Sequence, residues 1–335
     1  MIVTPDILST ECQLALSDLL QVPVDHVVAA WNAMRTSGGY DWHLLGDREI
    51  SVPVPVLSDL QRQILDRILR TGPVSPAAYA GVPGRSYVAA AWRHLGGTGA
   101  ETAVLDIADA FGSTTYGHVR AALSRRLKAE LWVLGLDPGD SKVLVQVLAH
   151  LVTVDRGGRT RQLPLGSPTS VAMFNLILLS LDGELARWCK PGKVTYTRYV
   201  DDMVFSRAGG LPVELEATVH RAVLRHGFRL NPAKTVRRPA GHGAVHGLVR
   251  VAEGIVPSER ARERFASNIG WHSDRAADTT SSAVQRQRSR GFLKGLDTYL
   301  QQFYERQEIS RPGPLEIRIP AGAAVPPPAV DLLWD

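Results

Sequence analysis

Two adjacent aspartates, Asp201 and Asp202, lie in a stretch that otherwise favours a β-strand. The sequence from Thr197 to Ser206 reads TRYVDDMVFS, and the aromatic and β-branched residues around the pair favour extended structure. The residues before it, KVTYT, have the same character, so we expect a hairpin with the aspartates at its bend. This position restricts the fold, because a carboxylate that is buried needs a compensating partner.

A solvated turn is the simplest interpretation of an Asp-Asp pair, but a second acidic strand argues against it. The upstream segment VLDIADAF carries Asp106 and Asp109 within an apolar sequence. Placed beside the hairpin, it would bring Asp106 against Asp201 and Asp202, and three close carboxylates require a cation. Magnesium prefers hard oxygen ligands and often joins carboxylates to substrate phosphates. Two such ions about 4 Å apart support in-line displacement at phosphorus, so the pattern indicates phosphoryl transfer.

Composition and charge are compatible with this chemistry without demanding it. The 335 residues are 44% hydrophobic and 21% charged, which is ordinary for a globular chain of two or three subdomains. The net charge of +5 and the pI near 9.3 suit a polyanionic partner. The two cysteines, Cys12 and Cys189, form no C-x-x-C pair, which argues against a zinc ribbon or a disulfide scaffold. Without a signal-like start or a long apolar run, we expect a cytoplasmic protein with no membrane association.

Periodicity predicts the following order of elements along the chain. Helices fill about residues 10–70 around one short strand, REISVPVPV, and a glycine-rich segment with GVPGRS precedes the strand ETAVLDIADAF. Helices GHVRAALSRRLKAEL and KVLVQVLAHLVTV follow, then a loop ending in LPLGSPTS, and one long helix, VAMFNLILLSLDGELARW, with Thr169 or Ser170 as its N-cap. After the hairpin we expect helix LEATVHRAVLRHGF, a loop at LNPAKT, and a strand pair formed by VRRP and AVHGLVRV. Arginine-rich helices after Pro257 suggest a separate helical subdomain, and the proline-rich tail 310–335 is expected to be extended or disordered.

Taken in order, these blocks resemble the reverse transcriptase family. YVDD resembles the family's metal-binding hairpin and VLDIADAF its first catalytic strand. The other matching blocks are REISVP with LQRQIL, GVPGRS, LPLGSPTS followed by a helix with Asn175, GFRLNPAKT and AVHGLVR, so the resemblance covers about residues 40–300. It implies an α+β right-hand polymerase fold with fingers, a palm (a ferredoxin-like antiparallel sheet with helices on one face) and a small helical thumb. The implied domains are 1–95 for N-terminal helices and fingers, 96–255 for the palm with a fingers segment at about 130–165, 256–309 for the thumb and 310–335 for the tail.

The resemblance also implies a set of site residues. Asp106, Asp201 and Asp202 would be catalytic and would bind two Mg²⁺ ions, with the carbonyl of Ile107 as a further ligand. The implied nucleotide-binding residues are Asp109, Ala110, Phe111, Arg48, Arg85, Gly166, Ser167 and Lys234. The implied primer and template contacts are Tyr199, Val200, His246 and Gly247.

Several of these residues have a plainer alternative. Phe111 falls where the family places the ring that excludes a ribose 2′-hydroxyl, and the alternative is a plain core phenylalanine. For Arg48, Arg85 and Lys234, expected at the triphosphate, the alternative is a solvated surface charge. Gly166 begins the turn Gly-Ser-Pro that ends at Pro168, and glycine tolerates the dihedral angles that such a close approach requires.

The length of the chain leaves no room for a ribonuclease H domain, which favours the compact bacterial enzymes, chiefly retron reverse transcriptases. The retron blocks match only in part. AAAWRH contains Ala90, where Asn is usual, followed by His94, and AVHG contains His246, where Thr is usual. Two further departures are Leu165, where the family has Gln, and Val171, where it has Pro. The loss of that Gln puts fidelity or template handling in doubt, not the metal ligands.

A retron-like enzyme would copy part of a structured non-coding RNA into DNA that is primed from a 2′-hydroxyl, in antiphage defence. Its expected partners are this RNA, an RNA–DNA hybrid, dNTPs and an effector protein. One alternative is a defence-associated reverse transcriptase that makes repetitive or untemplated DNA. An alternative of another class is a catalytically inactive RNA-binding scaffold, against which the three aspartates argue.

Overall fold

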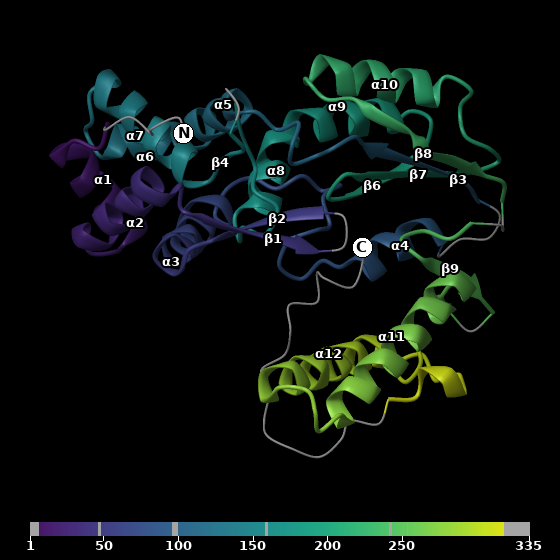
Figure 1. Ribbon diagram of the computed structural model, residues 1–335. Helices are drawn as coiled ribbons and strands as arrows, with labels where there is room; N and C mark the ends of the chain where they lie inside the picture. Colours follow the sequence, from purple (N-terminus) through teal and green to yellow (C-terminus); the bar gives the residue numbers. More distant parts are fainter. Residues whose placement is uncertain are drawn as a thin grey trace. The chain divides into compact units, whose positions relative to one another are not determined.

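The computed structural model describes residues 7–45, 48–95, 100–157, 160–240, 243–252 and 254–317, and its chain forms two compact units (Figure 1). Unit 1 comprises Met1–Ala90 and Thr102–Arg237, and unit 2 comprises Ala91–Glu101 and Arg238–Asp335. Each unit combines helices with β-strands, so the expected mixture of α and β structure is confirmed. Most of the proline-rich tail, from residue 318 onward, lies outside the described residues.

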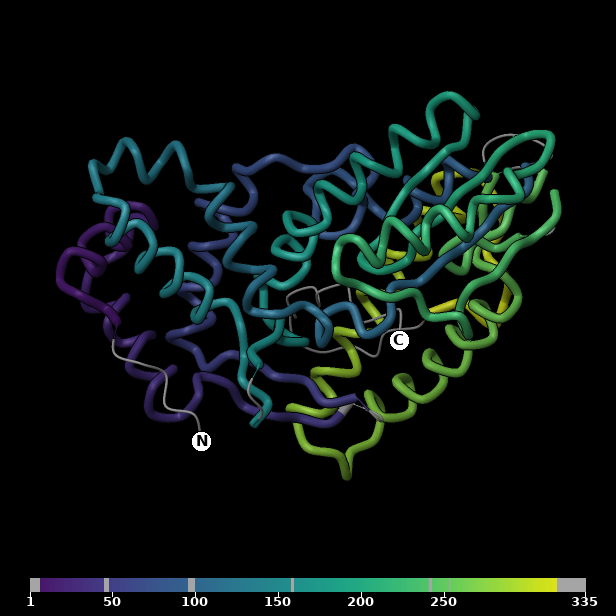
Figure 2. Tube along the Cα trace, turned by 90° about the horizontal axis from the view of Figure 1, so that it is seen from above, coloured from purple at the N-terminus to yellow at the C-terminus, as the bar shows by residue number. Residues whose placement is uncertain are grey.

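The helical part of unit 1 follows the predicted periodicity. Its helices are α1 (Thr10–Leu20), α2 (Val24–Ser37), α3 (Pro55–Ile64) with a π-helical turn (Leu65–Leu69), α5 (Tyr116–Arg126), α6 (Lys128–Val133) and α7 (Pro138–Leu151). Although α7 is more than a hundred residues from α1 and α2, it packs beside both (Figures 1 and 2). The helices begin at side-chain caps where the sequence offers one: Ser9 accepts from the amide of Cys12, and Asp137 accepts from the amide of Gly139. Buried Leu16, Leu20 and Trp31 belong to the core cluster beneath them.

Two small hairpins accompany these helices in unit 1. The predicted strand at REISVP is β2 (Arg48–Pro53), and it pairs antiparallel with β1 (Tyr40–Leu45), a strand that we did not predict. A shorter pair, β4 (Val154–Asp155) with β5 (Arg161–Gln162), lies in the segment that was expected to be a loop.

The central sheet of unit 1 has four strands in the order β6-β7-β3-β8. They are β6 (Thr195–Tyr199), β7 (Asp202–Ala208), β3 (Ala100–Ile107) and β8 (Leu230–Arg238). The hairpin of β6 and β7 and the strand β3 were both expected. Helices α8 (Ser170–Ile177) and α9 (Leu179–Cys189) precede β6 in the sequence, and α10 (Leu215–Arg225) lies between β7 and β8. In Figure 1, α9 and α10 run along one side of the sheet.

Three local expectations are wrong, and a fourth, the N-cap, is confirmed in position. The long helix is two helices, α8 and α9, interrupted at Leu178. Thr169 is the N-cap residue of α8, as expected, although its hydroxyl shares a 2.9 Å hydrogen bond with that of Ser167 and makes no cap bond. The segment LNPAKT is strand, not loop, because it forms most of β8. Finally, VRRP belongs to the end of β8, while β9 (Leu248–Val251) pairs with β10 (Gly254–Pro257).

Unit 2 is built on two long helices, α11 (Glu259–Ala277) and α12 (Ala283–Gln301), as predicted from the segment after Pro257. The rings of Phe265 and Tyr299 meet edge to face between them, with centroids 5.4 Å apart. The helix α4 (Tyr87–Leu95), not expected in the glycine-rich segment, begins in unit 1 and ends in unit 2. A short 3₁₀ turn (Gly313–Leu315) ends the described chain, with Leu315 buried.

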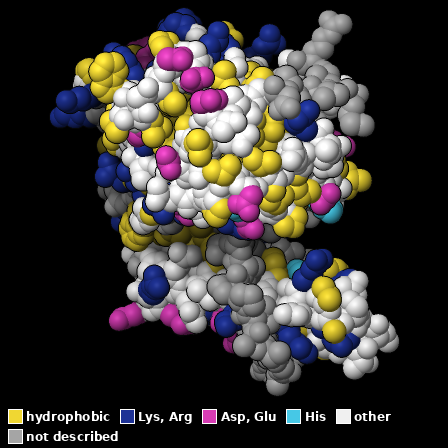
Figure 3. All heavy atoms as spheres, turned by 90° about the vertical axis from the view of Figure 1, so that its left-hand side faces the viewer, with side chains coloured by type: hydrophobic (Ala, Val, Ile, Leu, Met, Phe, Trp, Pro, Cys, Tyr) yellow, Lys and Arg dark blue, Asp and Glu magenta, His cyan; other side chains and the backbone are white. Residues whose placement is uncertain are grey.

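One side of unit 1 offers little to a polyanion. Figure 3 views the left-hand side of Figure 1, and in unit 1 hydrophobic and acidic side chains gather over its middle while Lys and Arg lie mostly toward its edges. Exposed hydrophobic residues of the helices in this part of the chain include Leu14, Trp132 and Val133. Within the described ranges, no helix combines the length and apolarity needed to cross a membrane.

Candidate active site

The hairpin of β6 and β7 carries the two adjacent aspartates at its turn. Tyr199 of β6 pairs with Asp202 of β7, so Val200 and Asp201 form the bend. Val200 has a φ of 53°, in the left-handed region that β-branched residues rarely adopt. Holding an L-residue there costs roughly 1–2 kcal/mol, so the surroundings must fix this turn.

Strand β3 brings the third aspartate to the same place. β3 is the neighbour of β7 in the sheet, and the amide of Ile107 donates a 3.1 Å hydrogen bond to the carbonyl of Asp201. Asp106 precedes Ile107 and is 2% exposed. The structure therefore brings Asp106, Asp201 and Asp202 together in unit 1, as the sequence predicted.

The carboxylates are close enough to perturb one another. The pKa of Asp202 is raised to about 7, first by burial and then by the charges of Asp201 and Asp106. Burial and then the charge of Asp106 also raise the pKa of Asp201. Arg48, at the start of β2, is among the cations that act in the opposite sense on Asp201. This concentration of buried negative charge favours a bound cation over a solvated turn.

Lys234 of β8 supplies one cation directly. Its Nζ donates a 3.1 Å hydrogen bond to Oδ2 of Asp106. Burial disfavours the charged amine, but the hydrogen bond and charge of Asp106 outweigh it, so the pKa of Lys234 is raised. Its side chain is 56% exposed, which leaves the ammonium accessible to a second anion.

Among the residues that the structure describes, no three or more His, Cys, Asp or Glu side chains are arranged as a ligand set for a metal ion. The donor chemistry at the hairpin nevertheless fits a hard divalent ion, because all three side chains are carboxylates whose charges oppose one another. Asp106, Asp201 and Asp202 are thus the residues that could hold one.

The chain after β3 forms a tight turn that presents the next predicted residues. Asp109 has a φ of 45°, and a Cβ on Gly112 would lie 2.2 Å from Oδ2 of Asp109, so a side chain at Gly112 would require this carboxylate to move. Ala110 is buried, and the hydroxyl of Thr114 donates to its carbonyl at 2.7 Å. The half-buried ring of Phe111 meets Phe174 of α8 edge to face, with centroids 5.8 Å apart.

The predicted Gly-Ser-Pro turn is anchored to β2 and α3. The amide of Ser51 donates to the carbonyl of Leu165 at 2.7 Å, and Gly166 has a φ of 113°. A Cβ on Gly166 would lie 2.7 Å from Cγ2 of Ile50, so the close contact with β2 depends on glycine. The hydroxyl of Ser167 donates at 2.8 Å to Oε1 of the buried Gln61.

The remaining predicted residues lie in different surroundings. Arg85 uses Nη1 to donate to the carbonyls of Ser75 (2.7 Å) and Ala78 (2.6 Å), so it fastens a loop of unit 1. The ring of Tyr199 meets that of Tyr87 edge to face, with centroids 6.1 Å apart.

His246 and Gly247 belong to unit 2. His246 is half-buried with a φ of 50°, and the burial of its ring lowers its pKa to about 4. Gly247 accepts a 2.8 Å hydrogen bond from the amide of Ser258.

A comparison with protein-family models finds no match. Among curated proteins, the chain is 35% identical over 227 residues to the retron Mx65 reverse transcriptase and 36% identical over 231 residues to the retron Mx162 reverse transcriptase, both of Myxococcus xanthus. The two matches cover 65% and 62% of this chain. The chain is a relative of the retron reverse transcriptases.

The matches confirm the resemblance that the sequence blocks predicted. A third relative, the retron Ec83 reverse transcriptase of Escherichia coli, is 28% identical over 163 residues. The chain spans about half the length of these curated relatives: 52%, 45% and 49%. Among solved structures, telomerase from Candida albicans aligns with 79% of this chain and 56% of its own at 10% identity, with a TM-score of 0.43, and no conclusion rests on it.

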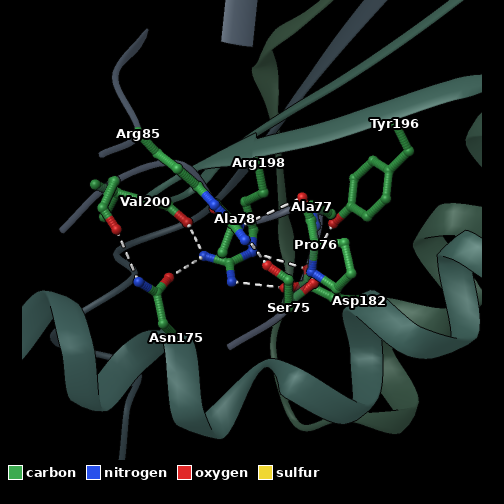
Figure 4. Close-up of polar contacts among 11 residues, drawn as sticks. Ser75, Pro76, Ala77, Ala78, Arg85, Asn175, Asp182, Tyr196, Arg198 and Val200 are labelled. Carbon is green, nitrogen blue, oxygen red and sulfur yellow. Dashed lines mark hydrogen bonds and ion pairs between the residues drawn. The ribbon is translucent and has the colours of Figure 1, made fainter. Parts of the chain in front are cut away.

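The sequence did not point to a buried polar cluster directly behind the hairpin turn. Arg198, two residues before Val200, is completely buried and forms an ion pair with Asp182 of α9, whose side chain is also inaccessible (Figure 4). The signal that could have found it is the arginine itself, because a strand position that faces the core rarely accepts a cation without an acidic partner elsewhere.

Proposed function

We propose that this relative of the retron reverse transcriptases is an RNA-directed DNA polymerase that copies part of a structured non-coding RNA. The observation that carries the proposal is the convergence of three buried carboxylates, Asp106, Asp201 and Asp202, at the end of β3 and the β6–β7 turn. In this proposal unit 1 supplies the fingers and palm, while helices α11 and α12 of unit 2 form the thumb. The substrates are dNTPs, and the bound nucleic acid is the RNA and its hybrid with the new DNA strand.

The carboxylates Asp106, Asp201 and Asp202 would hold two Mg²⁺ ions, with the Ile107 carbonyl as a further ligand. When bound, such ions stabilise the attacking and leaving oxygens of a displacement at phosphorus. The chain's own contribution is to fix these carboxylates in one buried place, where the charge of Asp106 opposes the ionisation of Asp201, and both oppose that of Asp202, until a cation is present.

The other residues of unit 1 bind and orient the nucleotide in this proposal. Lys234 keeps an exposed ammonium beside Asp106, from which it can reach the leaving pyrophosphate. Phe111 restricts the space for a 2′-hydroxyl, and its contact with Phe174 limits how far the ring can turn aside. Gly166 lets the turn after β5 approach a nascent base pair without a side chain in the way.

Primer extension on an RNA template with dNTPs and Mg²⁺ tests the activity. Wild type should incorporate dNTPs, whereas a double variant Asp201→Ala plus Asp202→Ala should lose all measurable incorporation. The matched control is Asp59→Ala plus Asp66→Ala, since these two aspartates lie exposed on α3 and the following turn. Equal incorporation by wild type and the hairpin double variant would eliminate the polymerase proposal.

The product distinguishes the retron-type reaction from its alternative. Sequencing the nucleic acid that copurifies with the chain should find DNA branched from a 2′-hydroxyl of one RNA. Long repetitive DNA would instead support a defence-associated enzyme of the other kind. The antiphage role stays a prediction, which phage plating on cells that carry wild type or the hairpin double variant would test.

A further inference from the structure

The cluster behind the hairpin turn is centred on the fully buried pair Arg198 and Asp182, which form hydrogen bonds with Asn175, Tyr196 and Val200 (Figure 4). Arg198 donates from Nε to Oδ1 of Asp182 at 2.9 Å and from Nη2 to Oδ2 at 2.7 Å. Its Nη1 donates to Oδ1 of Asn175 at 3.0 Å and to the carbonyl of Val200 at 2.7 Å. The hydroxyl of Tyr196 donates to Oδ1 of Asp182 at 2.7 Å, so both carboxylate oxygens are satisfied.

Burying such an ion pair is costly, because two charges leave water and their attraction only partly compensates for it. Stability alone is therefore a weak explanation for Arg198. The bidentate pairing with Asp182 fixes the plane of the guanidinium, and that plane aims Nη1 at the carbonyl of Val200. This geometry suits a residue whose role is to hold the backbone of the turn in place.

The group that Arg198 contacts is the strained residue of the turn. Val200 has a φ of 53°, which its β-branched side chain disfavours, and its carbonyl is the one that Nη1 holds. The next carbonyl, that of Asp201, accepts from the amide of Ile107 in β3. Both carbonyls of the turn are thus fixed, one from the Arg198 cluster and one from the strand that carries Asp106.

The backbone of Arg198 is also held on its other side. Its amide donates to the carbonyl of Ala77 at 2.6 Å, and its carbonyl accepts from the amide of Tyr79 at 2.9 Å. Arg85 fastens this loop by donating to the carbonyls of Ser75 and Ala78. The strand that leads into the aspartates therefore rests on a loop that cannot shift freely.

We propose that Arg198, oriented by Asp182 and Asn175, is a positioning residue that holds the Val200–Asp201 turn in its left-handed conformation and so directs Asp201 and Asp202 toward Asp106. Arg198 acts through the turn and touches no substrate. The inference deepens the proposed polymerase function and rests on it for its catalytic consequence.

The first experiment compares the kinetics of primer extension for wild type and Arg198→Lys. Lysine keeps the charge but has a single nitrogen, so it cannot bond Asp182 and the Val200 carbonyl as the guanidinium does. We expect kcat to fall about 10- to 100-fold with little change in the KM for dNTP, because misplaced carboxylates weaken the chemical step and not nucleotide binding.

Arg126→Lys is the matched control. Arg126 is also mostly buried and also joins a carboxylate, that of Glu130, to a backbone carbonyl, that of Ile68, but it lies on α5. It should change stability without changing kcat per folded molecule. Equal losses of kcat in the two variants, or a loss in Arg198→Lys that equals its unfolded fraction, would overturn the proposal.

A double-mutant cycle with Val200→Gly isolates the role of the strained turn. Glycine adopts a positive φ without the penalty that valine carries, so the turn then depends less on Arg198. The kcat loss caused by Arg198→Lys should shrink about threefold or more in the Val200→Gly background, as expected for residues in contact. Losses that simply multiply would show that Arg198 does not act through Val200.

Amide hydrogen exchange provides a readout that does not require activity. Exchange at residues 199–203 should be faster in Arg198→Lys than in wild type and unchanged in Arg126→Lys. If wild type extends no primer, the proposed function fails, and this measurement alone decides whether Arg198 holds the turn.

A second variant, Tyr196→Phe, serves if Arg198→Lys does not fold. It removes one hydrogen bond to Asp182 and keeps the stacked contact with Phe205. Unchanged exchange and unchanged kcat in Tyr196→Phe would count against the proposal.

Discussion

Ionisation of the Asp202 carboxyl group is unfavourable in the folded protein. Its pKa rises from an ordinary value of 3.8 to about 7, chiefly through burial and then through Asp201 and Asp106. A carboxyl whose folded pKa is raised keeps a proton that the unfolded chain has already released. The folded state therefore loses stability as the pH rises from near 4 to near 7, and the full penalty is present above that range.

Asp202→Asn should remove most of this pH dependence. With a chelator present, wild type should lose roughly 1–3 kcal/mol of unfolding free energy between about pH 5 and about pH 8, and the variant should lose less. Urea denaturation at each pH measures the difference. Adding Mg²⁺ near pH 8 should then stabilise wild type more than the variant. Parallel pH curves for the two proteins would show that Asp202 is not the group responsible.

Phe111 offers a test of the sugar gate that is independent of the metal ligands. Phe111→Ala removes the ring that would collide with a ribose 2′-hydroxyl, so incorporation of rNTPs relative to dNTPs should rise about tenfold or more. The ratio of kcat/KM values for the two nucleotides is the proper measure, because any loss of folded protein cancels from it. If the ratio does not change, Phe111 is a core residue that packs on Phe174 and no more.

At the scale of elements, Gln61 joins three parts of unit 1 through one buried side chain. Its Nε2 donates to the hydroxyl of Tyr40 at 2.8 Å and to the carbonyl of Leu151 at 2.7 Å, and its Oε1 accepts from Ser167. The side chain thus connects β1, the end of α7 and the Gly-Ser-Pro turn to helix α3. Loss of the Gln61 amide should weaken all three connections together, since each of its partners would be left without this hydrogen bond in the core.

Gln61→Leu should therefore destabilise the protein by roughly 2–4 kcal/mol. The measurement is the urea unfolding midpoint together with the slope. Gln13→Leu is the control, because the side chain of Gln13 donates to the carbonyl of Leu8 at the less buried start of α1, and its effect should stay within about 0.5 kcal/mol. A Gln61→Leu variant as stable as this control would show that the three hydrogen bonds contribute little.

Elements whose pattern is local were predictable, and those set by tertiary contacts were not. The period of apolar residues located α1, α2, α7 and α11, and the alternation around the aspartates located β6 and β7. β8 was missed because Asn231 and Pro232 resemble a turn. At the edge of the sheet, however, a proline costs no ladder bond on its outer side.

The same distinction separates the parts of the candidate site. The convergence of Asp106 with Asp201 and Asp202 followed from acidic residues in two apolar strands. The partner of Arg198 did not, because Asp182 lies on a helix and only tertiary packing brings it to the strand. Sequence thus located the charges of the site, while the groups that hold them in place required the structure.

For the molecule as a whole, helices α11 and α12 of unit 2 offer a nucleic acid a concentrated set of cations. Helices α11 and α12 together carry eight Lys or Arg residues against four Asp or Glu residues. Those with exposed side chains are Arg260, Arg264, Arg288 and Lys294. In contrast, the side of unit 1 in Figure 3 mixes acidic and hydrophobic groups. Phosphate contacts depend on such cations and carry little sequence information, so unit 2 is the expected site of general backbone binding.

Arg288→Gln plus Lys294→Gln should weaken binding to an RNA–DNA hybrid for every sequence tested. The physical reason is counterion release: each lost phosphate contact reduces the slope of log K against log salt by about 0.7–0.9. Removing two contacts should reduce the slope by roughly 1.5 and leave kcat at saturating hybrid unchanged. Fluorescence anisotropy over a series of salt concentrations gives the slope.

The matched control for this pair is Arg62→Gln plus Arg70→Gln, two exposed arginines of unit 1 that already pair with Asp59 and Asp66. Because each removes a cation that a neighbouring aspartate largely neutralises, this control changes the net charge by the same amount but should leave the slope near that of wild type. If both pairs reduce the slope equally, binding follows the net charge of the whole chain and not the helices of unit 2. A slope changed only by the α12 pair would locate the backbone contacts on that helix.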